Sequence, residues 1–318
     1  MTDTRTTPSD KRSLVMIGAP TDIGAKHRGA SMGPEAIRVA GAEAALRRLG
    51  FDVEDWGNLT GPANPDTPPV DGYRHLKETA AWCEAVRDAV YNELRAGRLP
   101  ILLGGDHSLA IGSVAAVAQH CTEQDTPFSV LWLDAHADFN TPKTSPSGNI
   151  HGMPVAILAG LGPKLLTEIG PQIPIVEASR IIQLGIRSVD AVEKANVVDS
   201  HLEVYDMRLV DEIRMLETMQ KVLSRVREIG GHLHVSFDID FLDPTIAPGV
   251  GTTVPGGPTY REAQLCMEMI YESGHMASLD LMELNPAFDD KNRTAELLVD
   301  LLGSLFGEQI LSRHNPER

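Results

Sequence analysis

Residues 128–138 read Phe128-Ser-Val-Leu-Trp-Leu-Asp-Ala-His-Ala-Asp138, an apolar run of strand length that ends in a polar cluster. The pattern recurs where Leu99-Pro-Ile-Leu-Leu103 leads to Gly104-Gly-Asp-His-Ser108, and where Leu233-His-Val-Ser-Phe237 leads to Asp238-Ile-Asp240. Continuously apolar strands are typical of a parallel sheet that helices cover on both faces. In such a sheet, ligands bind just beyond the carboxyl ends of the strands. We therefore expect the three clusters to meet at one site.

The rest of the chain alternates strand-like and helix-like segments. Further strands are expected at residues 14–18, 180–185 and 277–282, with weaker ones near 51–55 and 202–205. Helices are expected at about 34–49, 73–96, 108–119, 211–228, 259–273 and 291–311. This alternation predicts an α/β fold of three layers, α/β/α, around a central, mostly parallel eight-stranded sheet. We expect one catalytic domain, residues 13–318, after a disordered N-terminal tail, residues 1–12.

Composition narrows the class of protein. Lys and Arg total 28 against 44 Asp and Glu, so the net charge of the 318-residue chain is −16. Such a charge disfavours nucleic acid and anionic membranes as partners. The start of the chain lacks the apolar region of a secretory signal, and no stretch is long and apolar enough to cross a membrane. Three widely spaced cysteines fit reduced thiols, so we expect a cytoplasmic protein.

The residue types in the clusters indicate a metal site. Asp134, His136 and Asp138 alternate, as do Asp238 and Asp240, and on an extended backbone alternate side chains share one face. The four aspartates carry a charge of −4, which two divalent cations would neutralise. With His107, the donor set is four carboxylates and two imidazoles, which suits manganese, although zinc, cobalt or nickel could also bind. Two such metals would bridge and activate a hydroxide for hydrolysis.

The three clusters resemble the signatures of the ureohydrolases, the family of arginases and agmatinases. The resemblance extends from Gly29-Ala-Ser-Met-Gly-Pro34 to Glu283-Leu-Asn-Pro286 and implies a centre of two Mn²⁺ per subunit. It implies that the first metal binds His107, Asp134, Asp138 and Asp238, and that the second binds Asp134, His136, Asp238 and Asp240. Asp134 and Asp238 would then bridge the two metals.

In detail, the chain is most similar to arginases, which hydrolyse L-arginine to L-ornithine and urea. The similarity implies that Asn140, Ser147 and Asn149 receive the substrate carboxylate, that Asp190 binds its amino group, and that Thr252 lines the pocket. It also implies three catalytic residues. Asp138 accepts a hydrogen bond from the metal-bridging hydroxide, His151 transfers a proton to the leaving amine, and Glu283 holds the guanidinium.

Some positions depart from the family pattern, which leaves the substrate open. Ala137, Met153 and Phe241 lie close to the expected pocket rim, so the substrate could instead be agmatine, 4-guanidinobutyrate or a formimino compound. The same ligand types would also fit a deacetylase with one zinc or a metal-binding protein without activity. The segment Tyr260-Arg-Glu262 resembles one at the arginase trimer interface, so we expect a homotrimer or homohexamer that acts on a small guanidino substrate.

Overall fold

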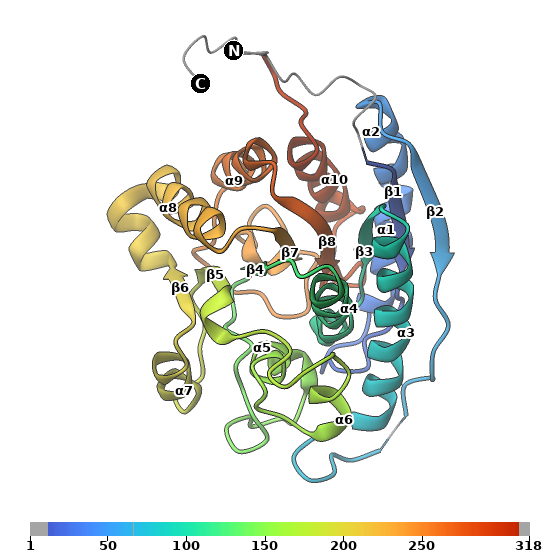
Figure 1. Ribbon diagram of the computed structural model, residues 1–318, viewed down its shortest axis with the longest axis vertical. Coiled ribbons are helices and arrows are strands. Elements are labelled where there is room, and N and C mark those ends of the chain that lie inside the picture. The colour runs from blue at the N-terminus through green and yellow to red at the C-terminus, as the bar shows by residue number, and fades with distance from the viewer. Residues whose placement is uncertain (1–11, 66, 312–318) are drawn as a thin grey trace.

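An all-parallel sheet forms the centre of the molecule (Figure 1). The computed structural model describes residues 12–65 and 67–311. Residues 1–11 of the tail expected at 1–12 lie outside this range, as does the end of the chain from residue 312. The eight strands of the described residues are β1 Leu14–Gly18, β2 Val53–Asn58, β3 Leu99–Leu103, β4 Phe128–Leu133, β5 Ile181–Ile186, β6 Glu203–Asp206, β7 His232–Asp238 and β8 Met276–Met282. Their order is β2-β1-β3-β8-β7-β4-β5-β6. The predicted α/β class is confirmed.

Helices cover both faces of this sheet, and the strand side chains alternate between two cores. Leu131 and Leu133 belong to one core, whereas Val130 and Trp132 belong to the other. The first core is closed by α1 Gly33–Val39, α2 Ala42–Arg48, α8 Met207–Ile229, α9 Tyr260–Ser273 and α10 Arg293–Leu305. The second is closed by α3 Leu76–Arg95, α4 Ala110–Glu123, α5 Pro154–Leu158 and α6 Lys164–Thr167, with α7 Glu193–Asp199 at its margin. Apolar contact on both faces explains why the strands are continuously apolar.

Three sequence expectations need correction. The helix expected at residues 34–49 is two helices, because Gly41 between them has a φ of 90°, which ends a right-handed helix. The short helices α5, α6 and α7 were not predicted, since so few residues show no clear period. The extended alternation expected beyond β4 and β7 is wrong: Asp138 has a φ of 50°, and Asp240 lies in the 3₁₀ turn Ile239–Phe241.

The strand order nevertheless brings the polar clusters together. Strands β3, β8, β7 and β4 are consecutive neighbours in the sheet. All run in the same direction, so their carboxyl ends share one edge, and each is followed there by one of the predicted clusters or by Glu283. Among the described residues, no helix has the length and apolar character needed to cross a membrane.

Candidate metal centre

His107 enters the site from a tight turn after β3. Gly105 permits this turn, because a Cβ there would lie 1.7 Å from the Thr21 carbonyl oxygen. The Asp106 carboxylate then accepts a hydrogen bond from Ser108 N at 3.0 Å and caps the 3₁₀ turn that carries His107. The side chain of His107 is 1 % exposed. The local sequence therefore buries an imidazole at the end of the strand.

The His107 ring is held on two sides and directs one nitrogen at carboxylates. It stacks on Trp132 with centroids 4.0 Å apart, and its Nε2 lies 2.9 Å from Ser236 Oγ. Its Nδ1 lies 3.0 Å from Asp238 Oδ2 and 3.1 Å from Asp134 Oδ2. Since the Ser236 contact occupies Nε2, Nδ1 is the nitrogen placed to coordinate a metal.

A second group forms around His136. Its Nδ1 lies 3.0 Å from Asp240 Oδ2 and 3.5 Å from Asp134 Oδ1. Backbone N–H groups orient these carboxylates: Ala135 N donates to Asp240 Oδ1 at 3.1 Å, and His136 N donates to Asp134 Oδ1 at 2.6 Å. The ligand atoms of His107, Asp134 and Asp238 lie within 4.8 Å of one another, as do those of Asp134, His136 and Asp240. Asp134 belongs to both groups.

The charges of these groups fit two divalent cations. Burial, followed by the charge of Asp134, raises the pKa of Asp138 well above its ordinary value. Burial, followed by the charges of Asp240 and Asp134, does the same to the pKa of Asp238. Burial would lower the pKa of His107, but the hydrogen bond and charge of Asp134, with the charges of Asp138 and Glu283, together outweigh burial and raise this pKa to about 9. Four buried carboxylates this close together favour bound cations, and a set of oxygen and imidazole donors without sulfur suits divalent metals.

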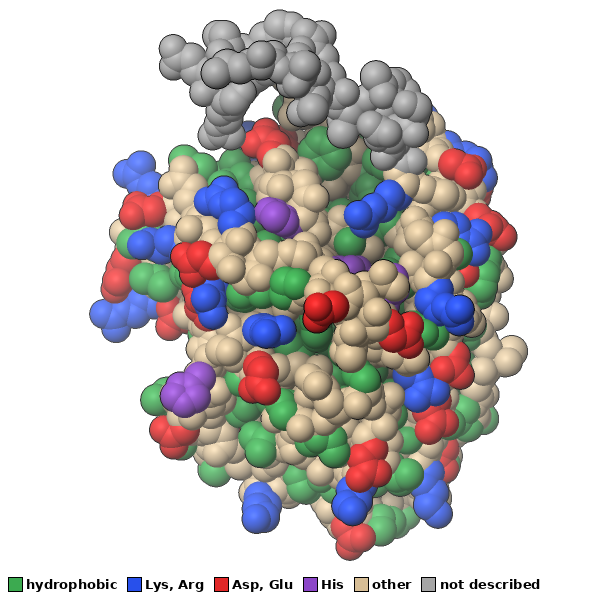
Figure 2. All heavy atoms as spheres, viewed as in Figure 1, with side chains coloured by type: hydrophobic (Ala, Val, Ile, Leu, Met, Phe, Trp, Pro, Cys, Tyr) green, Lys and Arg blue, Asp and Glu red, His purple; other side chains and the backbone are tan. Residues whose placement is uncertain are grey.

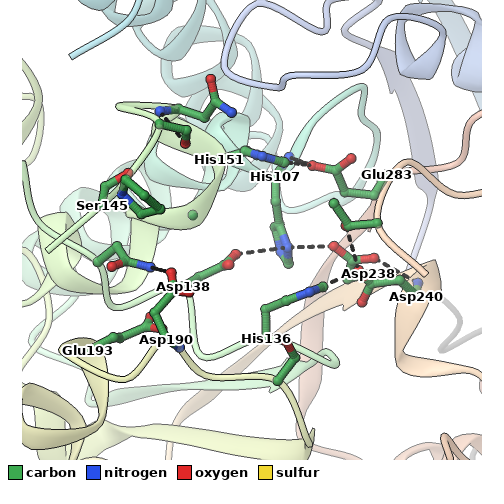
Figure 3. Close-up of a pocket in the computed structure, with 17 residues that line it drawn as sticks. His107, His136, Asp138, Ser145, His151, Asp190, Glu193, Asp238, Asp240 and Glu283 are labelled. Carbon is green, nitrogen blue, oxygen red and sulfur yellow. Dashed lines mark hydrogen bonds and ion pairs between the residues drawn. The ribbon is translucent and has the colours of Figure 1, made fainter. Parts of the chain in front are cut away.

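A pocket of about 250 Å³ opens over these groups (Figure 3). Most of the predicted site residues line it: His107, His136, Asp138, Asn140, Ser147, Asn149, His151, Asp190, Asp238, Asp240, Thr252 and Glu283. Asp134, the remaining one, lies beneath them and is fully buried. The structure thus brings together residues that are up to 176 positions apart in the chain.

Glu283 and His151 point at each other at one end of the pocket, as Figure 3 shows. Glu283 Oε1 accepts a hydrogen bond from His107 N at 2.9 Å and lies 3.0 Å from His151 Nδ1. Burial would raise the pKa of Glu283, but the charge and hydrogen bond of His151, together with the hydrogen bond from His107 N, outweigh burial and lower this pKa. Burial would likewise lower the pKa of His151, and the Glu283 carboxylate raises it instead. The pair places a carboxylate and a proton donor beside the candidate metals.

Asp190 lies away from Glu283, on the other side of the pocket (Figure 3), and Asn140 is hydrogen-bonded to it. Asn140 Nδ2 donates to Asp190 Oδ2 at 3.0 Å, while Asn140 Oδ1 and Asn149 Oδ1 are buried without a partner among the described residues. The Ser147 hydroxyl oxygen accepts a bond from Asn149 N at 3.2 Å, which leaves its own proton for a ligand. This end of the pocket can therefore bind both a negatively and a positively charged group of a ligand.

Five lining residues were not predicted from the sequence: Ser145, Pro146, Gly152, Ser188 and Glu193. Glu193 has a structural role, because its carboxylate accepts bonds from Phe139 N at 2.7 Å and Asp190 N at 3.0 Å. It therefore links the Asn140 loop to Asp190. A glutamate three residues after Asp190, at the start of a helix, was the only sequence signal for it.

Comparisons with known proteins agree with this geometry. A family model described as the arginase family matches residues 12–307. An arginase of Brucella melitensis is 46% identical over 305 residues, which cover 94% of this chain and 97% of that protein. An arginase of Agrobacterium fabrum is 42% identical over 311 residues, covering 96% of this chain and 94% of that protein. Among solved structures, arginase from Bacillus caldovelox matches with a TM-score of 0.90 at 41% identity, covering 95% of this chain and all of that one.

Proposed function

Because this chain belongs to the arginase family of ureohydrolases, we propose that it hydrolyses the guanidinium group of L-arginine to give L-ornithine and urea. The observation that carries the proposal is the pocket itself. It has carboxylates and imidazoles suited to two metals beneath it, an acidic residue at one end and amide and hydroxyl groups at the other. Arginine carries a guanidinium at one end and a carboxylate and an amine at the other.

We propose two Mn²⁺ ions as the resident metals. One would be held by His107, Asp134, Asp138 and Asp238, and the other by Asp134, His136, Asp238 and Asp240. When bound, the two ions supply an activated water as nucleophile and stabilise negative charge. The second group, Asp134, His136 and Asp240, would be surplus in an enzyme with a single zinc, which favours this proposal over a deacetylase.

The residues at the guanidinium end position the substrate and move protons. The Glu283 carboxylate would hold the guanidinium by charge-assisted hydrogen bonds, and it is itself fixed by His107 N and His151. Asp138, one of the proposed metal ligands at the pocket wall, would accept a hydrogen bond from the attacking water. His151 would deliver a proton to the leaving amine, because an imidazole can donate and accept near neutral pH.

The residues at the other end select the amino acid. Asn140, Ser147 and Asn149 would bind the carboxylate, Asp190 would bind the amine, and Thr252 would line the pocket beside Asp240. The Asn149 amide, turned over, presents its NH₂ to a carboxylate oxygen, and the Asn140 NH₂ has a second proton besides the one it donates to Asp190. Agmatine has no carboxylate and would leave these groups unpaired, which costs binding free energy.

Urea release from arginine, agmatine and 4-guanidinobutyrate by the manganese-loaded protein tests the substrate. We expect arginine to be preferred, and the Asp190→Asn variant to raise KM for arginine by about tenfold or more, with little change for 4-guanidinobutyrate, which lacks the amine. Asp199→Asn, an exposed change in α7, is the matched control. Turnover of agmatine with arginine inert would refute the assignment of the amino-acid end. No turnover of any guanidino compound would favour a protein that only binds metal.

We further propose a cytoplasmic homotrimer or homohexamer with one catalytic domain, residues 13–318. A groove between α8 and α9 supports the oligomer, since Leu216 there is 50% exposed and residues 309–311 lie along it. The three cysteines are buried and unpaired, which suits a reducing compartment. Acidic and basic side chains are mixed on the face in Figure 2, which favours a small-molecule substrate over nucleic acid. Light scattering after gel filtration measures the oligomer, and a monomer would refute it.

A further inference from the structure

Arg187 lies behind the metal centre and outside the pocket lining. Its guanidinium donates only to backbone carbonyl oxygens: Nε to Val254 at 3.1 Å, Nη1 to Gly185 and Phe241 at 3.1 Å each, and Nη2 to Asp240, Val254 and Leu242 at 2.8, 2.9 and 3.2 Å. Three of these carbonyls, those of residues 240–242, are consecutive. A planar fork of five N–H donors can collect them, whereas an ammonium group cannot.

These bonds fix the turn that presents Asp240. While the backbone carbonyl of Asp240 faces Arg187, the Asp240 carboxylate lies 3.0 Å from His136 Nδ1 and accepts a hydrogen bond from Thr252 Oγ1 at 3.2 Å. Val254 follows Thr252 by two residues, so the same guanidinium holds the backbone near both partners of this contact. Gly257 leaves room for the guanidinium, because a Cβ there would lie 2.6 Å from Arg187 Nη2. The turn and the following loop therefore share one anchor.

The backbone of Arg187 is hydrogen-bonded next to Asp134 and His136, the other two residues of the second group. Arg187 N donates to Ala135 O at 2.9 Å, and Ala135 separates Asp134 from His136. Ala135 N in turn donates to Asp240 Oδ1 at 3.1 Å. Arg187, Ala135 and Asp240 thus form a closed ring of hydrogen bonds behind the second group. No comparable contact links Arg187 to His107 among the described residues.

The charge of Arg187 also faces the carboxylates. Burial lowers its pKa, while the charges of Asp240 and then Asp134 raise it. The side-chain hydrogen bonds of Arg187 all go to neutral carbonyls. Its positive charge therefore interacts with the Asp240 and Asp134 carboxylates through space and not through a direct ion pair.

We propose that Arg187 is a positioning residue for the second metal group, Asp134, His136 and Asp240, and sets the affinity of that group for its divalent cation without touching cation or substrate. The inference rests on the proposed two-metal function. Its effect is mainly on one metal of the two, because His107 of the first group is held by Trp132 and Ser236 instead.

Calorimetric titration of the chelator-treated full chain with Mn²⁺, with metal content after gel filtration, tests this inference. For Arg187→Lys we expect one of two binding events to weaken by about 10- to 100-fold and the other by less than about threefold. Asp240→Asn should weaken the same event, and the double variant should add little to it. Urea release should recover at high Mn²⁺. Arg38→Lys is the matched control, since Arg38 is another multiply bonded, partly buried arginine, bound to Asp55 far from the site.

Two unchanged binding events in a folded Arg187→Lys protein would overturn the inference, as would equal weakening of both events. Should Arg187→Lys fail to fold, Gly257→Ala provides the same test. It keeps the arginine and its charge but crowds Nη2 and the backbone of the same turn at Phe241 O and Asp243 N, and it should weaken the same single event. The titration needs no turnover, so arginine proving inert would count against the proposed function and leave the metal result standing.

Discussion

Replacing Trp132 by phenylalanine would test how the fold holds the first metal group. Trp132 is fully buried on β4, and its Nε1 donates to Asp134 Oδ2 at 2.9 Å. Its ring also stacks on His107 with an angle of 8° between the two planes. One side chain therefore orients two candidate ligands. Phenylalanine keeps a ring against His107 and removes the N–H.

The size of the effect follows from that single lost bond. A hydrogen bond to a charged group contributes about 1.5–3 kcal/mol. Because about 1.36 kcal/mol corresponds to a factor of ten, the affinity for manganese should fall by roughly 10- to 150-fold. The loss should appear mainly in metal binding, with arginine turnover restored at saturating Mn²⁺.

Titration of the metal-free Trp132→Phe protein with Mn²⁺ measures this loss. The control is Trp82→Phe, because Trp82 is also buried and its Nε1 donates to Pro62 O at 2.9 Å, far from any candidate ligand. Trp82→Phe should lower the free energy of unfolding and leave metal affinity within about twofold of wild type. Equal metal affinity in wild type and Trp132→Phe would refute the reasoning, as would equal losses in the two variants.

Three further predictions concern the pH dependence of stability, the role of His151 in turnover and the packing of the core. In the metal-free protein, the pKa of His107 is raised to about 9, so the folded state binds this proton more tightly than the unfolded state. The raised pKa of Asp138 acts in the same direction. Thermal unfolding of the metal-free protein should therefore show stability falling between about pH 6.5 and 9. Added Mn²⁺ should raise the Tm more at pH 9 than at pH 6.5. A metal-free protein that gains stability over this pH range would contradict this prediction. His151→Asn should lower kcat for urea release by about 10²- to 10⁴-fold with metal content unchanged, and loss of a metal ion would assign His151 a different role. Leu279→Ala, in the centre of β8, should cost about 2–5 kcal/mol in chemical denaturation, and a cost under about 1 kcal/mol would mean that the core there is loosely packed.

The class of fold and the chemical character of the site can be predicted from the amino-acid sequence alone. Strands such as β3, β4 and β7 are buried on both faces, and this burial appears in the chain as an unbroken apolar run. Polar residues directly after such runs must lie at the carboxyl edge of the sheet, so the three clusters are recognisable along the chain. Length and period did not reveal the break at Gly41 or the short helices, since these depend on one backbone angle or on a few residues.

How the clusters meet, and what holds them, depends on tertiary packing. The order β3-β8-β7-β4 places His107, Glu283, Asp238 and Asp134 side by side, and loop lengths alone do not specify that order. The predicted alternation of side chains was wrong in its local geometry, because the turns after β4 and β7 are not extended. The supporting contacts of Trp132, Ser236 and Arg187 join segments distant in sequence. Their geometry depends on the packing of neighbouring strands, which a pattern read along one chain does not contain.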